Sequence, residues 1–377
     1  MTNDSGRKFE YVVFTCTIFL IAFGLMVLYS ASSVQSMRIY ENSVYFFLRQ
    51  LIFCGIGIVV ALFISFVPYK VYTAPSKYLY LSILMLVILT TFAGRISRGA
   101  SRWIQLRGIV FQPSELMKLA LILYLSKVLV EIKGNFEKKD NFLRVMLVAY
   151  APTFIIALAN LSTGIIMFVI ATTLIFIVSR KKLIFLFLDV LIVLFYMFAY
   201  PMSNVLYTAG LLKSYQVGRI FAWKDPSNYP DIAYQTLQGL YAIGSGRLTG
   251  RGYLSSIQKS ILPEAHNDMI FAILCEELGL VGSLIFIILY FILIFRIFYI
   301  ASKQKELTTM LITFGIGIHI ALQVLLNIGV TTNLLPNTGV TLPFVSYGGS
   351  SLIVTFIEIG IVMSISRMSL KDDKKSI

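Results

Sequence analysis

The chain has 377 residues, of which 58% are hydrophobic and 13% are charged, and its formal net charge is +14. Soluble domains carry about 25% charged residues, so this composition excludes an ordinary soluble protein and indicates an integral membrane protein. Its three cysteines all lie in apolar runs, and their spacing predicts neither a metal site nor a disulfide framework. We interpret the positive charge as a signal of topology and affinity for anionic membrane lipid, and we expect no nucleic-acid partner.

The first apolar run, residues 11–30, follows Arg7 and Lys8 and resembles a signal peptide. Because it reaches the length of a membrane span, we predict an uncleaved first helix. Later apolar runs lack the alternation of a membrane barrel, so helices must satisfy their backbone in lipid. We predict an all-α polytopic protein, one membrane domain over residues 1–377, with ten transmembrane helices. The predicted spans are about 11–30, 46–67, 78–94, 115–131, 145–160, 163–179, 183–200, 269–300, 310–332 and 349–366.

Two of these regions are unusual. Residues 145–179 are divided only by "LANLSTG", which makes this pair of spans the weakest prediction. The run 269–300 is too long for one upright span, so it must tilt or extend past the bilayer.

Lys and Arg set the expected orientation, because they accumulate in short cytoplasmic loops. With the N-terminus inside, the short outer loop 31–45 holds only Arg38 as a basic residue, and the loop 333–348 holds no charge. Both termini are therefore predicted to be cytoplasmic, and residues 201–267 form a large extracellular loop. The basic residues on the inner side are Arg7, Lys8, Lys70, Lys77, Lys133, Lys138, Lys139, Arg144, Arg180, Lys181, Lys182, Lys303, Lys305, Arg367, Lys371, Lys374 and Lys375.

One short outer loop breaks this rule. The segment "GRISRGASRWIQLRG" (94–108) carries four arginines, including Arg98 and Arg102, with Trp103 among them. It is either a loop tied to anionic headgroups or a guanidinium cluster that grips phosphate. Trp103 suits an interfacial anchor or a platform for sugar stacking.

The large outer loop contains two further features. Residues 231–246 carry an apolar face that predicts a short helix lying on the membrane. Residues 244–259, with four glycines, are either a flexible loop or a segment whose Arg247, Arg251 and Lys259 meet an anionic ligand.

Ionisable residues inside predicted spans are expensive in lipid and are usually functional or paired. Lys118 follows Glu115 by three residues, a spacing that allows pairing, while phosphate binding by Lys118 is equally open. Ser114 is a candidate helix cap. We assign the remaining charged or titratable residues mainly to interhelical bonding: Asp189, Glu276, Glu277, Arg296, His319 and Glu358.

The stretch "ILPEAHNDMIF" (261–271) places Glu264, His266 and Asp268 just before an apolar run. Asp268 is either an N-cap or a general base that takes a proton from a hydroxyl. A helix dipole would lower its pKa, whereas apolar surroundings or Glu264 would raise it. His266 could orient a carboxylate, although a hydrogen-bonded scaffold histidine is the more ordinary interpretation.

The last outer loop, "NLLPNTGVTLPFVSYGGSSL" (333–352), is uncharged and rich in hydroxyl and amide groups. Such groups suit sugar hydroxyls, and N–H groups at the following helix start suit an anion. A re-entrant loop that needs polar groups for its own backbone is the alternative.

Three long segments together resemble the shape, elongation, division and sporulation family of FtsW, RodA and SpoVE. They are "RGASRWIQLRGIVFQPSELMKL", "LPEAHNDMIFAILCEELGLVG" and "PNTGVTLPFVSYGGSSL", in the family's order. The resemblance implies a ten-span peptidoglycan glycosyltransferase of the bacterial cytoplasmic membrane, with its active site facing outward. It implies lipid II as substrate, β-1,4 glycan strands as product, and a class B penicillin-binding protein of the division or elongation machinery as partner. It assigns no cofactor or metal ligand with certainty, and a divalent cation is compatible with it.

Carried onto this chain, the family's catalytic Asp falls on Asp268, in "HND" where many relatives read "HTD". A second departure is "NLSTG" (160–164) in place of "PDLGT"; it lacks an Asp and favours the FtsW/SpoVE branch. Arg219 and Gln235 lie where the long outer loop of relatives has matching residues. The predicted residues for substrate and pyrophosphate binding are Arg98, Arg102, Trp103, Glu115, Lys118, Arg219, Glu264, His266, Ser346 and Ser350.

Two other functions remain alternatives. A lipid II flippase would use intramembrane charges such as Glu276 and Arg296 to line a path, but transporters usually show pseudo-symmetric halves, and the large outer loop has no counterpart. A non-catalytic scaffold for the division machinery would leave Asp268 as a simple cap.

Overall fold

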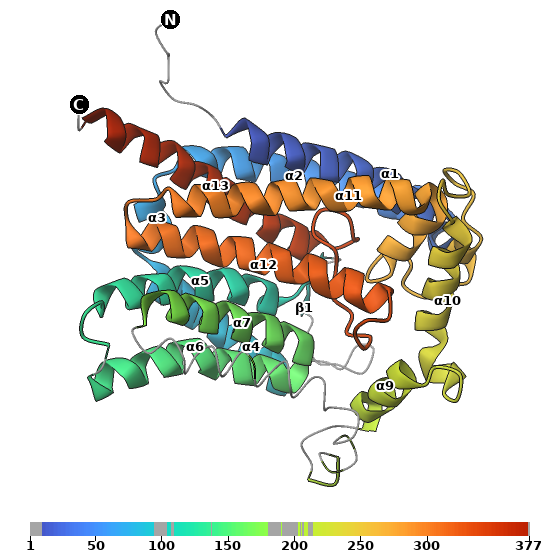
Figure 1. The fold of residues 1–377 in the computed structure, drawn as a ribbon, viewed down its shortest axis with the longest axis horizontal. Helices are drawn as coiled ribbons and strands as arrows, with labels where there is room; N and C mark the ends of the chain where they lie inside the picture. Colours follow the sequence, from blue (N-terminus) through green and yellow to red (C-terminus); the bar gives the residue numbers. More distant parts are fainter. Residues whose placement is uncertain are drawn as a thin grey trace, which may run out of the picture.

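The structure, a computed structural model, is a bundle of long helices that run roughly side by side (Figure 1). The residues that it describes are 10–93, 104–106, 109–136, 138–179, 190, 203, 205, 207–209 and 214–375. The first half contains α1 (Tyr11–Tyr40), α2 (Tyr45–Phe66), α3 (Tyr69–Thr73), α4 (Ser76–Ala93), α5 (Pro113–Glu131), α6 (Lys139–Ala159) and α7 (Leu161–Val178). The second half contains α9 (Ser214–Lys224), α10 (Pro230–Gly246), the 3₁₀ turn η1 (Gln258–Ser260), α11 (Ile270–Ser302), α12 (Leu307–Thr331) and α13 (Gly349–Lys375).

The predicted spans agree with this architecture. Nine of the ten coincide with helices, and of the other, residues 183–200, only residue 190 is described. Within the described part, seven helices are long and apolar enough to cross a membrane; α4 is shorter, and α5 carries several charges. The total of ten therefore stays a prediction. The all-α prediction is confirmed apart from a small antiparallel ribbon of β1 (Ile104–Leu106) and β2 (Ile109–Phe111).

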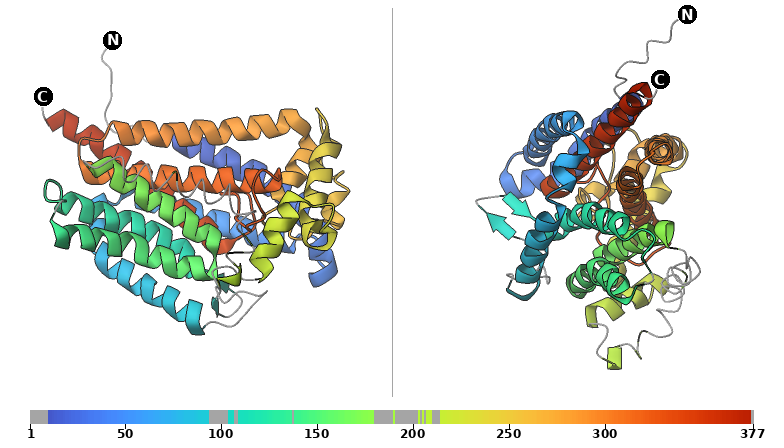
Figure 2. Two further views of the ribbon diagram at one scale, coloured as in Figure 1. Left: turned by 60° about the horizontal axis from the view of Figure 1, so that its bottom comes forward. Right: turned by 90° about the vertical axis from the view of Figure 1, so that its left-hand side faces the viewer.

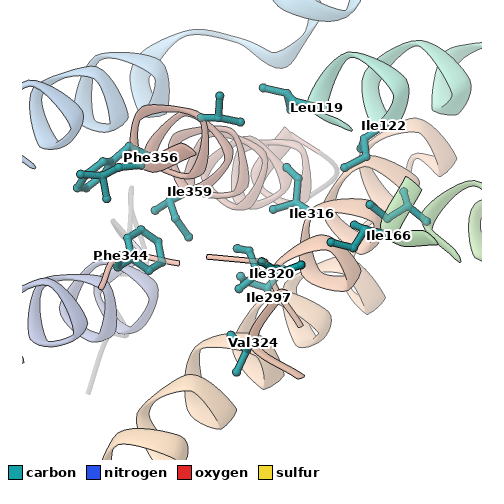
Figure 3. Packing of buried hydrophobic residues seen from close by; sticks show 14 of the residues in the cluster. Leu119, Ile122, Ile166, Ile297, Ile316, Ile320, Val324, Phe344, Phe356 and Ile359 are labelled. Carbon is teal, nitrogen blue, oxygen red and sulfur yellow. The ribbon is translucent and has the colours of Figure 1, made fainter. Parts of the chain in front are cut away.

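The most polar spans lie inside the bundle. Of the span in α13, 72% of residues are buried, compared with 22% in α2, so α13 is central and α2 faces the lipid. Nearly all of α5 is buried as well, which lets a helix with Glu115 and Lys118 run through the bundle without facing lipid. Figure 3 shows side chains of α5, α7, α11, α12 and α13 meeting in this core.

Close packing of α2 against α13 depends on glycine. A Cβ at Gly57 would lie 1.9 Å from the Phe356 ring, and one at Gly360 would lie 2.7 Å from the Ala61 carbonyl oxygen. Small residues at such contacts let helix backbones approach in lipid, where dispersion and not the hydrophobic effect drives association.

The weak break between the fifth and sixth predicted spans is real. Helix α6 ends at Ala159, and Asn160 accepts a hydrogen bond from the Thr163 N–H at 3.4 Å as the N-cap of α7. An Asn side chain at this position satisfies one of the orphan donors of the new helix.

Helix α11 is broken at Gly279, which has φ 65° and ψ −168°. The segment 247–252 fills the break: Leu280 N donates to Arg247 O at 2.9 Å, and Arg251 N donates to Glu276 O at 2.9 Å. These bonds replace the helical bonds that the break removes, so the backbone stays satisfied inside the bundle. The sequence predicted a tilted or extended span here and did not predict a break.

One end of the bundle is closed by α10, which lies across the ends of the long helices (Figures 1 and 2). The C-terminal ends of α1 and α12 and the start of α11 lie at this α10 end, whereas α1 begins and α13 ends at the opposite end. The prediction of a short helix at 231–246 is confirmed by α10.

Candidate functional site

Asp268 lies at the α10 end, two residues before α11 begins at Ile270. It is not a helix cap, because Met269 is the N-cap and makes no side-chain capping bond. Its carboxylate instead accepts a hydrogen bond from Gln235 Nε2 on α10, with 3.2 Å between Nε2 and Oδ1. The capping interpretation is therefore wrong, and the side chain is held by a residue 33 positions earlier.

A chain of polar contacts continues from this carboxylate. Asn337 Nδ2 donates to Gln235 Oε1 at 2.8 Å, and Arg219 on α9 donates to the backbone oxygen of Asn337 at 3.2 Å. Trp223, one turn later on α9, donates to Asn333 O at 3.0 Å. Helices α9 and α10 and the uncharged loop 333–348 therefore meet around Asp268.

Hydrogen bonds from Asn327 and Ser346 hold the backbone beside Asp268. Asn327 on α12 donates from one amide nitrogen to Asp268 O at 2.9 Å and to Val340 O at 2.8 Å. Ser346 donates to Asn267 O at 2.5 Å and accepts from Leu342 N at 2.8 Å. Because a buried amide group is costly to leave unpaired, these bonds hold the two loops in one arrangement.

The environment raises the pKa of Asp268 to about 6. Loss of hydration on burial is the largest cause, and the negative charge of Glu264 adds to it, while the Arg219 charge and the Gln235 hydrogen bond oppose it. The residue as a whole is nevertheless not fully buried. A carboxyl group with this pKa is ionised at neutral pH and is a stronger base than an ordinary Asp.

The two other titratable residues of the 261–271 stretch have different surroundings. Glu264 has φ 53° and accepts hydrogen bonds from Asn267, whose side-chain amide and backbone N–H both reach it. His266 is buried, its ring is stacked on Phe46 with 4.6 Å between centroids, and its backbone oxygen accepts from Tyr347 N at 2.9 Å. This arrangement agrees with a scaffold histidine.

Glu115 and Lys118 form the predicted pair, with 3.0 Å between Lys118 Nζ and Glu115 Oε2. Ser114 is not the cap of this helix, because Gln112 occupies the N-cap position and donates to the Ser114 hydroxyl. Among the described residues, no hydrogen bond joins this pair to Asp268. A role for Lys118 in binding phosphate stays a prediction.

Several of the remaining predicted residues lie in parts of the chain that the structure does not describe. Arg98, Arg102 and Trp103, like Asp189, lie outside the described residues. Ser350 is in the first turn of α13 and is partly exposed. Within the described ranges, no group of three or more His, Cys, Asp or Glu side chains is arranged to hold a metal ion.

The intramembrane charges that could have lined a transport path are engaged in the fold. Arg296 pairs with Glu10 at 2.6 Å, and His319 pairs with Glu358 at 2.8 Å between α12 and α13. The Glu276 carboxylate accepts from Ser256 Oγ at 2.5 Å and from Ile257 N at 3.0 Å. Interhelical bonding was predicted for these residues and is confirmed for His319 and Glu358, whereas Arg296 bonds to Glu10 just before α1 and Glu276 bonds to a loop.

The glycine-rich segment is packed against α11 and is not a flexible loop. A Cβ at Gly250 (φ +79°) would lie 2.1 Å from Glu277 O, and one at Gly246 would lie 2.0 Å from Cys275 O. The glycines therefore allow two backbones to touch. Lys259 donates to Leu254 O at 2.6 Å within the same segment, while Arg247 and Arg251 remain exposed.

Sequence reasoning missed Asn327, which is placed by the tertiary fold alone. It named Gln235 and described the loop that contains Asn337, but it selected neither residue for the site, since nothing in the sequence links α10 and this loop to Asp268. An amide side chain inside an apolar run, as at Asn327, is the one signal that was present.

Together, the fold and this site define a polytopic helical membrane protein with a basic carboxylate at one end of its bundle. A family model described as cell cycle protein, covering FtsW, RodA and SpoVE, matches residues 10–371. The chain belongs to this family, which confirms the resemblance and indicates a multi-pass protein of the bacterial cytoplasmic membrane.

Similar proteins cover almost the whole chain. Stage V sporulation protein E of Bacillus subtilis is 36% identical over 94% of this chain and 95% of its own length. The probable peptidoglycan glycosyltransferase FtsW of Coxiella burnetii is 35% identical over 95% of this chain and 96% of its own length. A chain of a solved peptidoglycan synthase complex, described as coordinating polymerization and crosslinking, has a TM-score of 0.77 and 25% identity, covering 96% of this chain and 98% of that chain. The rod shape determining protein RodA of Thermus thermophilus has a TM-score of 0.68 and 26% identity, covering 95% and 97%.

Proposed function

We propose that this protein is a peptidoglycan glycosyltransferase that extends glycan strands from lipid II at the outer face of the cytoplasmic membrane. Relatives of full length carry this activity in their names, and a solved neighbour is part of a peptidoglycan synthase. The observation that carries the proposal is a partly exposed Asp268 with a raised pKa, held by Gln235 and facing the loop 333–348.

In the proposed reaction, Asp268 takes the proton of the acceptor 4-hydroxyl. The acceptor oxygen then forms a bond to the anomeric carbon of the donor, and the bond from that carbon to the pyrophosphate oxygen breaks. The electron pair leaves with the lipid pyrophosphate, so the anomeric carbon is inverted and a β-1,4 linkage results.

The departing pyrophosphate needs positive charge nearby. The positive charge of Arg219 is close enough to lower the pKa of Asp268. We propose that Arg219 contacts the departing pyrophosphate. Lys118, Arg98 and Arg102 are further candidates, Trp103 is a candidate platform for a sugar, and Ser346 and Ser350 are candidates for hydroxyl contacts. A divalent cation would assist in the same way.

We infer that the protein works with a transpeptidase of the penicillin-binding class in division, elongation or sporulation. The support is the solved complex that coordinates polymerization with crosslinking, whose chain matches this fold throughout. The flippase alternative is not favoured, because relatives are named as glycosyltransferases and the described intramembrane charges are bonded within the fold.

The test is polymerisation by purified protein and partner in lipid nanodiscs. We expect wild type to convert lipid II into glycan strands, and Asp268→Ala to lower the rate by at least about 100-fold, since general base catalysis contributes that much. Asp231→Asn, which removes an exposed acid on α10, should match wild type. Polymer formed by a folded Asp268→Ala variant at the wild-type rate would exclude Asp268 as the base, and movement of lipid II across the bilayer without polymer would support the flippase.

A further inference from the structure

An aromatic patch lies at the α10 end where α1 turns into α2. It consists of Tyr40, Tyr45, Phe46, Arg49 and Tyr347. The rings of Tyr40 and Tyr45 are stacked with 3.7 Å between centroids, and Phe46 contacts Tyr45 at 5.6 Å and Tyr347 at 4.9 Å. Helix α1, helix α2 and the loop before α13 each contribute to this one cluster.

The patch combines accessible ring surface with hydrogen-bonding groups. Tyr40 is 43% exposed, and Tyr45, Arg49 and Tyr347 are partly exposed. Arg49 donates to the Tyr45 hydroxyl at 2.9 Å, and its guanidinium carbon lies 5.5 Å from the Tyr45 ring centroid. Flat apolar faces edged by a few polar groups are typical of small-molecule sites and suit the C–H faces and hydroxyls of a pyranose.

The patch packs against the segment that holds Asp268. Phe46, at its buried edge, stacks on His266, and Tyr347 N donates to His266 O. His266 precedes Asp268 by two residues. Two ring contacts, of 4.6 and 5.6 Å, therefore lead from the segment that holds Asp268 to the partly exposed Tyr45.

We propose that this aromatic patch binds the carbohydrate of the glycan strand next to the site of sugar transfer. The proposal rests on the proposed function and adds a binding site to it. Sugars already joined would stack on Tyr40 and Tyr45, while Arg49 and the tyrosine hydroxyls bond to their oxygen atoms. A strand held here would stay attached to the protein between additions, so the patch would influence how long the strands become.

Tyr residues are also enriched at membrane interfaces, where single rings lie among headgroups. The patch differs from such a belt because its rings stack on one another and on the histidine beside Asp268. An anchor needs no contact with a polar loop, whereas this patch contacts the loop before α13 and the segment that holds Asp268.

The experiment uses the full chain with its partner in nanodiscs. It compares wild type, Tyr45→Ala, Tyr45→Phe and, as a matched control, Tyr241→Ala, which removes an exposed ring of α10 outside the patch. Two quantities are measured: the length of strands formed from lipid II at equal substrate consumption, and the affinity for a soluble, lipid-free peptidoglycan tetrasaccharide.

We expect Tyr45→Ala to bind the tetrasaccharide about threefold to tenfold more weakly, the effect of losing one aromatic stacking contact, and to make shorter strands. Tyr45→Phe keeps the ring and loses only the hydroxyl contacts, so it should weaken binding less than Tyr45→Ala does, and Tyr241→Ala should equal wild type. Should Tyr45→Ala fail to fold, Tyr40→Ala replaces it, because that side chain is more exposed.

Unchanged affinity and strand length in the alanine variants would overturn the proposal. Lower thermal stability with unchanged affinity would also overturn it, because that result indicates a membrane anchor. If wild type makes no glycan, the proposed function is wrong. The affinities for the tetrasaccharide still test whether the patch binds carbohydrate.

Discussion

At the scale of single residues, the acidity of Asp268 should set the pH dependence of the enzyme. A general base works only when ionised, and the pKa of this carboxyl is about 6. We expect kcat/KM to rise about tenfold per pH unit below pH 6 and to level off above it. Initial rates between pH 4.5 and 8 test this. A flat profile across pH 6 would mean that another group accepts the proton.

Substitutions of two neighbours of Asp268 should shift this pH profile in opposite directions. Glu264→Gln removes a negative charge that raises the pKa of Asp268, so the acid limb should move to lower pH. Gln235→Leu removes a hydrogen bond that lowers this pKa, so the limb should move to higher pH. Asp231→Asn is the control and should leave the midpoint in place. A uniform loss of rate at every pH, with no change of midpoint, would assign both residues a purely structural role.

The candidate site shows where sequence reasoning ends. Residue type and position left Asp268 as either an N-cap or a candidate base, and the family resemblance favoured the base. They left the direction of its pKa open, since a helix dipole and a carboxylate oppose each other. The structure shows a raised pKa because burial removes the hydration of the carboxylate and Glu264 adds a negative charge nearby, while the Gln235 hydrogen bond opposes the rise. This burial depends on the tertiary fold, which also brings Gln235 and Asn327 into hydrogen-bonding distance of Asp268.

At the scale of elements, the break in α11 depends on the glycines of the segment packed into it. Gly250→Ala would place a Cβ 2.1 Å from Glu277 O at φ +79°. We expect it to cost about 2–5 kcal/mol through strain and overpacking. Gly244→Ala is the matched control, because Gly244 has nothing within 4 Å and lies in α10. It should stabilise by about 0.5–1 kcal/mol.

Thermal unfolding of both variants in the same detergent measures these effects. The position of Gln235 relative to Asp268 depends on how α10 and the following segment pack on α11, so Gly250→Ala should also lower the polymerisation rate. Equal melting temperatures for the two alanine variants would show that the segment does not hold the break.

At the scale of the whole molecule, apolar length predicted most of the architecture. Each described span coincides with a run of apolar residues, because the bilayer sets helix length independently of tertiary contacts. The order of helices in the bundle was not predicted, since it depends on packing such as Gly57 against Phe356. The segment 244–259 was also left open, because glycines in a sequence are compatible with both mobility and close backbone contact.

The orientation of the bundle is the remaining prediction from the charge pattern. Asp268 must face outward if it polymerises lipid II on the outer surface, and the opposite end must then face the cytoplasm. All three native cysteines are buried, so they should react little with a thiol reagent, and labelling will report the introduced cysteines. Ser227, between α9 and α10, and Ser302, at the end of α11, are exposed at opposite ends. In intact cells, we expect a membrane-impermeant maleimide to label Ser227→Cys and to leave Ser302→Cys unlabelled until the membrane is opened. The reverse pattern would place Asp268 in the cytoplasm and contradict both the orientation and the proposed reaction.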